Sequence, residues 1–188
     1  MKLNERAFLI YKLSNSSFTG LSIGILFTIY QPIADPAIYS LGGMILALGM
    51  LILAKFYDRI LNILSFYRIS LFVEIIIMLS IFSFLLLKYS LTSALIIYCS
   101  YQLTFIFGGY LVRAETLVAK NKELLGKIDI NKQIGYLLGL GFSYLFYKLL
   151  EFGFNITDSK IQIIILHYIL ILLQSFIIIS LLKSFKKS

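Results

Sequence analysis

The residues that could do chemistry are few, and most lie at the borders of long apolar segments. Glu74 is the exception, because it is an acid deep within one such segment. A charge inside a membrane costs at least about 2.5–3.5 kcal/mol on insertion scales, so Glu74 needs a partner, a proton or water. Two interpretations stay open. One is a structural ion pair with a basic residue such as Arg59 or Arg113, and the other is a carboxylate that couples an ion or proton to transport.

A second group of polar residues is concentrated in segment 89–112. Such a group in the middle of a bilayer prefers protein or water to lipid. Together with polar residues of the first segment it could line a cavity for a polar solute, or it could make hydrogen bonds between helices. The candidate solute-lining residues are Asn15, Ser22, Thr28, Tyr98, Tyr101, Gln102 and Thr104.

No arrangement of residues predicts catalysis or metal binding. His167 is the only histidine and Cys99 the only cysteine, so the chain holds no Cys/His cluster and no internal disulfide. No histidine or lysine is placed to activate a serine at a common depth. We therefore expect no enzymatic activity, no cofactor and no metal, and we interpret His167 as a hydrogen-bonding residue near the membrane surface.

The composition predicts an integral membrane protein. Hydrophobic residues make up 60% of the 188 residues and charged residues 14%, whereas about 25% of a soluble domain is charged. The expected partner is therefore a lipid bilayer. The net charge of +8 does not indicate nucleic-acid binding, because the basic residues are dispersed between apolar segments and do not gather on one soluble face.

The apolar segments predict an all-α fold with six transmembrane helices in a single domain that covers residues 1–188. A spanning helix needs about 20 residues, and the fifth segment reaches that length only by including flanking charges. The expected spans are 13–34, 36–54, 69–87, 89–112, 130–148 and 161–182. The expected link 113–132 is the longest, and we expect it to be partly helical.

The basic residues predict the orientation. With six spans, 14 of the 17 lysines and arginines fall on the side of the termini, including Lys187, and three fall on the other side. Such a bias places both termini in the cytoplasm. We expect a multi-pass protein of a bacterial plasma membrane. Small residues at helical spacing, namely Gly20, Gly24, Gly135 and Gly139, predict close helix packing.

The link between the second and third spans resembles a signature of the major facilitator superfamily, Gly-x-Leu-x-Asp-Arg-x-Gly-Arg-Arg/Lys. Asp58-Arg59 matches its acid–base pair, while Ala54, Phe56 and Leu61 replace its first Gly, its Leu and its second Gly. Other matching features follow. They are Asn15 to Gly20 before the first span, Arg113 at the end of the fourth, and Gly126, Gly135 and Gly139, after which Leu140, Ser143 and Tyr144 replace the remainder of the fifth-helix signature.

The resemblance covers the whole chain but only one half of a twelve-helix transporter. It implies two inverted three-helix repeats, a solute site between two halves, and hence a homodimer that moves an unknown small solute by alternating access. It also implies that Asp58 latches Arg59 and Arg113 in one conformational state. Two alternatives stay open: a substrate-binding subunit of a multi-component importer that docks through Gly20 and Gly24, and a non-transporting scaffold or relic.

Overall fold

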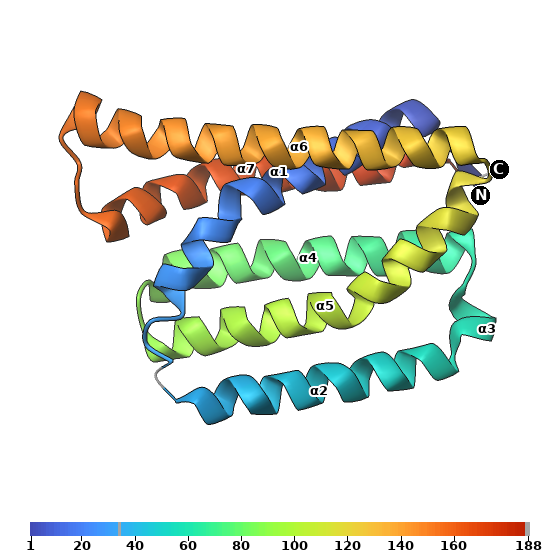
Figure 1. Cartoon of the computed structure of the whole chain (residues 1–188), viewed down its shortest axis with the longest axis horizontal. Coiled ribbons are helices and arrows are strands. Elements are labelled where there is room, and N and C mark those ends of the chain that lie inside the picture. Colours follow the sequence, from blue (N-terminus) through green and yellow to red (C-terminus); the bar gives the residue numbers. More distant parts are fainter. Residues whose placement is uncertain (34, 187–188) are drawn as a thin grey trace.

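The computed structural model describes residues 1–33 and 35–186, and nearly all of them are helical (Figure 1). This confirms the all-α prediction. The helices are α1 (Glu5–Ile29), α2 (Pro36–Lys55), the short α3 (Tyr57–Ile60), α4 (Ile63–Leu87), α5 (Leu91–Ala119), α6 (Lys122–Lys148), the π-helical turn η1 (Leu149–Gly153) and α7 (Ser159–Ser184). Two-residue strands, β1 (Lys2–Leu3) and β2 (Phe185–Lys186), flank them.

The helices begin where a polar side chain can cap the first free backbone N–H groups. Asn4 and Asn62 do this for α1 and α4, and Ser90, Asn121 and Asp158 for the last three long helices. Such caps satisfy donors that have no partner within the helix. In α2 the cap Asp35 is followed by Pro36, whose missing N–H costs nothing in the first turn.

The helices extend beyond several expected spans, mostly at the end where the termini lie. α5 continues to Ala119 and α6 begins at Lys122, so the expected link 113–132 is almost entirely helix. By length and composition, four described helices could cross a membrane, namely α2, α4, α5 and α7. Ala34, at the end of the first expected span, and Lys187, in the basic count, lie outside the described residues.

Both termini lie at the same end of the bundle (Figure 1). β1 and β2 pair antiparallel there, with Lys2 opposite Lys186 and Leu3 opposite Phe185. The Phe185 ring packs against Phe8 of α1 and Phe66 of α4, with ring centres 5.9 and 6.0 Å apart. The pairing therefore ties the first and last helices to α4 at this end.

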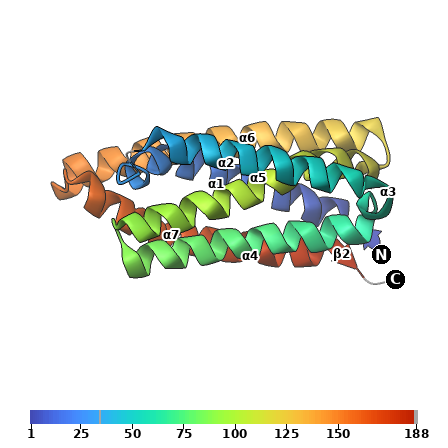
Figure 2. The same ribbon diagram turned by 90° about the horizontal axis from the view of Figure 1, so that it is seen from below.

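The long helices pack in a two-fold pattern. α1 contacts α6 and α7, whereas α5 contacts α2 and α4, and α4 contacts α7. Exchanging α1 with α5, α2 with α6 and α4 with α7 reproduces this set of principal contacts. Figure 2 shows α4 and α7 side by side along one face, with the other four long helices above them. We call that opposite side, formed by α1, α2, α5 and α6, the front face.

Large apolar side chains cover much of the surface. Phe27 and Leu86 are 79% and 82% exposed, and α2 buries only Gly42. Soluble monomers rarely expose apolar patches larger than a few hundred Å². The surface therefore agrees with contact to lipid, as the composition indicates.

Candidate functional site

Glu74 lies in the middle of α4, is 1% exposed, and is surrounded by neutral donors. The Tyr11 hydroxyl and the Asn15 amide of α1 each donate to its Oε1 at 2.8 Å. The Gln174 amide of α7 donates to Oε2 at 2.8 Å and to the Glu74 carbonyl oxygen at 2.9 Å. The predicted need for partners is thus met by hydrogen bonds and not by Arg59 or Arg113.

These bonds make Glu74 a junction of three helices. A hydrogen bond to a charged group contributes about 1.5–3 kcal/mol, so three side-chain donors offset much of the cost of burial. Because α4 and α7 are exchanged by the two-fold pattern, Glu74 and Gln174 meet where its two halves join. The deepest acid of the chain therefore sits at the centre of the fold.

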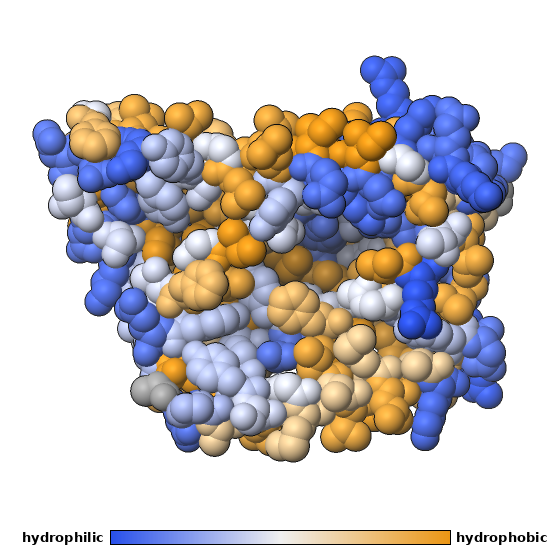
Figure 3. Space-filling view, in the orientation of Figure 1, coloured by the Kyte–Doolittle hydropathy of each residue, from blue (hydrophilic) through white to orange (hydrophobic). Residues whose placement is uncertain are grey.

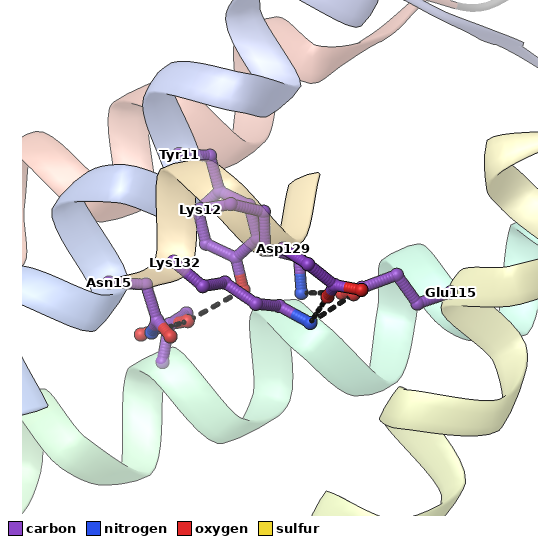
Figure 4. Close-up of polar contacts among 7 residues, drawn as sticks. Tyr11, Lys12, Asn15, Glu115, Asp129 and Lys132 are labelled. Carbon is purple, nitrogen blue, oxygen red and sulfur yellow. Dashed lines mark hydrogen bonds and ion pairs between the residues drawn. The ribbon is translucent and has the colours of Figure 1, made fainter. Parts of the chain in front are cut away.

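A second buried carboxylate, Glu115 of α5, was not identified from the sequence. It is 2% exposed and pairs with both Lys12 of α1 and Lys132 of α6. Lys132 also lies 3.5 Å from the exposed Asp129. Figure 4 shows the two lysine side chains approaching Glu115 from different helices. We call Lys12, Glu115, Lys132 and Asp129 the charged cluster.

Lys12 is itself buried, at 8% exposed. Its ammonium group lies over three aromatic rings, 5.3 Å from the centre of Phe8, 5.4 Å from Tyr11 and 5.6 Å from Phe66. Cation–π contacts are strongest where water is excluded. The rings and Glu115 together therefore replace the water that this charge gives up.

The acid–base pair of the resemblance lies on the surface. Asp58 is 4.0 Å from Arg59, and both side chains are more than 70% exposed. Arg113 does not meet Asp58 in this conformation, because its guanidinium lies over the Tyr57 ring at 5.5 Å. The latch between Asp58 and Arg113 stays a prediction for another state.

The predicted solute-lining residues are distributed over several places. Ser22 and Tyr101 line a cavity of about 20 Å³ with Ser80 and His167, which has room for about one water molecule. Asn15 binds Glu74 instead. No common solute cavity forms from these residues within the described part of the chain.

The remaining members of that set have separate partners or positions. Tyr98 donates to the Tyr39 carbonyl at 3.3 Å, Thr104 donates to the Tyr101 carbonyl at 2.8 Å, and Thr28 is half-buried near the end of α1. Gln102 lines a groove of about 310 Å³ between α2 and α5. Its Oε1 atom is buried without a hydrogen-bond partner among the described residues.

The front face is hollowed along its middle. Figure 3 shows hydrophilic and intermediate side chains in this recess, between more apolar margins over α6 and α2. Phe105 of α5, one of the helices that form this face, is 55% exposed and lies one turn after Tyr101, with ring centres 6.1 Å apart. The front face therefore carries an open recess and not a closed cavity.

The predicted glycine contacts divide into tight and open positions. A Cβ atom at Gly135 would overlap the Leu13 carbonyl, one at Gly139 the Ser17 carbonyl, and one at Gly20 the Tyr136 carbonyl. Gly24 has open space instead. Three of the four glycines therefore hold α1 against α6, backbone to backbone.

Comparison with protein-family models, with curated proteins and with solved structures gives no match for this chain.

Proposed function

We propose that this chain is one half of a secondary transporter that crosses the membrane six times, with both termini in the cytoplasm. Two copies would form the active unit and move a small solute by alternating access, as in the major facilitator superfamily. The two-fold packing of the six long helices is the observation that carries the proposal. Inverted repeats of this kind are characteristic of secondary transporters.

The repeats are α1–α2–α4 and α5–α6–α7. Each has three long helices, so the second repeat runs through the bundle in the opposite direction to the first. Glycines lie at the equivalent contacts in both. Gly135 and Gly139 of α6 face α1, while Gly42 and Gly49 of α2 face Tyr98 and Ile106 of α5. These equivalent contacts support a common architecture for the two repeats, although no sequence repeat is evident between them.

The recess of the front face supports a second copy as the partner. In transporters built from such halves, the solute site lies at the interface between them near the bilayer midplane. One copy offers α1 and α5 as the floor and α2 and α6 as the margins, which leaves the recess open on one side. A second copy facing it would close the recess around a solute.

The charge distribution supports the orientation. The end of the bundle that carries both termini also carries the links α2–α4 and α5–α6 (Figure 1). Most basic residues belong to these segments and to the adjoining helix ends. Cytoplasmic segments carry such an excess of lysine and arginine. α1 and α6 bear several of these charges in the halves that lie near the termini, and the remainder of α6 exposes apolar side chains such as Leu137 and Leu145 that lipid would cover.

The importer-subunit alternative loses part of its basis, because the backbone of α6 packs against Gly20 and leaves no room there for a partner. Only Gly24 of that pair remains open. We therefore retain this alternative and the scaffold alternative as outcomes of the test below.

Cysteine cross-linking tests the proposed dimer. In a Cys99→Ser background, Phe105→Cys places one thiol at an exposed position of α5, a helix of the front face. Leu79→Cys places one on α4, outside that face, where Leu79 is 60% exposed. With a short bifunctional maleimide in native membranes, we expect a cross-linked dimer for Phe105→Cys and monomer for Leu79→Cys. A monomer for both variants, confirmed by native mass in mild detergent, would contradict the homodimer.

Charge exchange between Asp58, in the link between α2 and α4, and Arg113 of α5 tests the proposed transport. We expect Asp58→Arg and Arg113→Asp each to impair uptake and the double exchange to restore part of it, if these charges meet in one state. Failure of the double exchange to restore uptake would favour the importer-subunit alternative.

A further inference from the structure

We propose that Glu74 binds the coupling proton, and that the charged cluster (Lys12, Glu115, Lys132 and Asp129) connects it to the end of the bundle that carries the termini. This inference rests on the proposed function for its physiological role. It adds the identity of the coupling ion and the route by which that ion enters.

The surroundings of Glu74 favour a proton over a metal cation. Its two carboxylate oxygens already accept three hydrogen bonds, from Tyr11, Asn15 and Gln174. A metal cation would have to displace these donors and gather several oxygen ligands. A proton needs only one lone pair, and the neighbouring hydroxyl and amide groups can rearrange around a neutral carboxyl group.

The groups that face Glu74 from the elements packed against it are few. From α1 they are Tyr11 and Asn15, and from α7 Gln174. Lys12 follows Tyr11 directly and connects to Glu115 of α5. No other charged side chain of the described residues pairs with this group, so protonation of Glu74 changes the charge of this region by one.

The outer part of the route leads to the surface. Glu74 is 1% exposed, and the side chains of Lys12 and Glu115 are also buried, at 10% and 3%, whereas those of Lys132 and Asp129 are 26% and 64% exposed. Lys132 connects Glu115 to Asp129, since it pairs with both carboxylates. The cluster thus forms a series of ionisable groups on α1, α5 and α6 that leads from the buried centre to the surface (Figure 4).

The two parts of the route meet at neighbouring residues of α1. The Lys12 ammonium lies over the Tyr11 ring, 5.4 Å from its centre, and the Tyr11 hydroxyl donates to Glu74. In this conformation the Lys12 ammonium contacts the face of the Tyr11 ring and not its hydroxyl, so the transfer begins with a rotation of the Lys12 side chain that brings Nζ to the Tyr11 oxygen. The Tyr11 oxygen then takes a proton from the Lys12 ammonium while the Tyr11 O–H proton passes to Glu74 Oε1. The Lys12 amine regains its proton from Lys132 through Glu115, and Lys132 regains its own from water beside Asp129.

After this sequence, one proton has moved from water to Glu74 and every other group is restored. The step across the Lys12–Tyr11 contact is the one that rotation of the Lys12 side chain controls. Protonated Glu74 would hold the donors of α1 and α7 less strongly, because hydrogen bonds to a charged acceptor are the stronger kind. Proton binding would therefore loosen the junction between the two repeats.

The test uses purified full-length protein in lipid nanodiscs and measures protons alone. After a rapid drop in pH, a water-soluble dye reports proton uptake, and infrared difference spectra report the C=O band of a protonated carboxyl group. We expect Glu74→Gln to remove one proton per chain and the matching band. Glu115→Gln and Lys132→Met should keep that band at equilibrium but slow its appearance about 10²-fold or more.

The exposed pair Glu123–Lys127 of α6, with 2.5 Å between charged atoms, provides the control off the route. Lys127→Met should leave the rate unchanged. If Glu115→Gln does not fold, Lys132→Met and Asp129→Asn carry the test of the route. An unchanged band in Glu74→Gln would overturn the site, and wild-type rates in the route variants would overturn the route.

These outcomes are separable from failure of the proposed function, since neither measurement needs a solute or a second copy. A monomer that still protonates Glu74 by this route would contradict the homodimer alone. A cross-linked dimer whose proton uptake is insensitive to Glu74→Gln would contradict the present inference alone.

Discussion

The contact between α1 and α6 gives the sharpest prediction about stability. Alanine at Gly135 or Gly139 would place a Cβ atom against the carbonyl oxygen of Leu13 or Ser17, well inside van der Waals contact. Carbon–oxygen contacts normally lie at about 3.3–3.6 Å, so the two helices would have to separate by about 1 Å. Because backbone and not a flexible side chain is in the way, relaxation is limited to moving a whole helix.

Overpacking of this kind costs about 1–3 kcal/mol, and rigid neighbours favour the upper part of that range. Separation also weakens the dispersion contacts along the interface, since a small gap already loses a quarter or more of each contact. We therefore expect Gly139→Ala to lower the free energy of unfolding by about 2–3 kcal/mol. Gly135→Ala should have a similar effect.

The matched controls are Gly24 of α1 and Gly141 of α6, where an added Cβ meets nothing within 4 Å. Alanine there should be neutral or should stabilise by up to about 1 kcal/mol through helix propensity. Unfolding can be followed by titrating sodium dodecyl sulfate into protein in a mild detergent. The chain has 13 tyrosines and no tryptophan, so tyrosine fluorescence is the signal. Equal stability of the Gly139→Ala and Gly24→Ala variants would refute the reasoning.

Three further changes test other parts of the molecule. Gln174→Leu removes the amide that donates to Glu74 Oε2 and to its carbonyl, and we expect a loss of about 1–3 kcal/mol in the same titration. The Lys127 hydrogen bond and charge lower the pKa of Glu123, so Lys127→Met should raise that pKa toward its usual value, as measured by carboxyl NMR. Because this pKa is lowered, the pair contributes to folding stability above the usual pKa of Glu123, and that contribution is lost as the pH falls through the lowered pKa. Asp58→Asn should leave stability unchanged, because the Asp58 side chain is 73% exposed.

The sequence predicted the helices but misplaced several of their ends. Runs of apolar residues identify helices well, yet cutting the chain at charges assumes that a helix stops where polarity begins. Here α1 includes Lys12, α5 includes Glu115 and α6 includes Lys132. The caps Asn4 and Asn121 were the available signal, since each precedes a helix whose first turn is polar.

The candidate site was predictable only in part. Burial of Glu74 required partners, and that requirement could be read from one residue and the apolar segment around it. Which partners meet it depends on the rotation of α1, α4 and α7 about their axes, and weakly patterned helices fix no such rotation from sequence. Gln174 is a single polar residue in the last apolar segment, which gives it no role from sequence, and Tyr11 precedes the expected span 13–34.

The two equivalent helix contacts differ in a way that bears on movement. α1 and α6 touch through backbone at Gly135 and Gly139, whereas α2 meets α5 through the side chains of Tyr98 and Ile106 beside an open groove. α2 also buries only one residue. Packed backbones resist displacement, and side chains in a groove can change rotamer, so α2 is the long helix held least firmly. The Asp58 link follows that helix, and an exposed ion pair contributes only about 0–1 kcal/mol. If the link acts as a gate, its movement therefore comes from the loose packing of α2, and the charges of Asp58 and Arg59 select between positions that this freedom already allows.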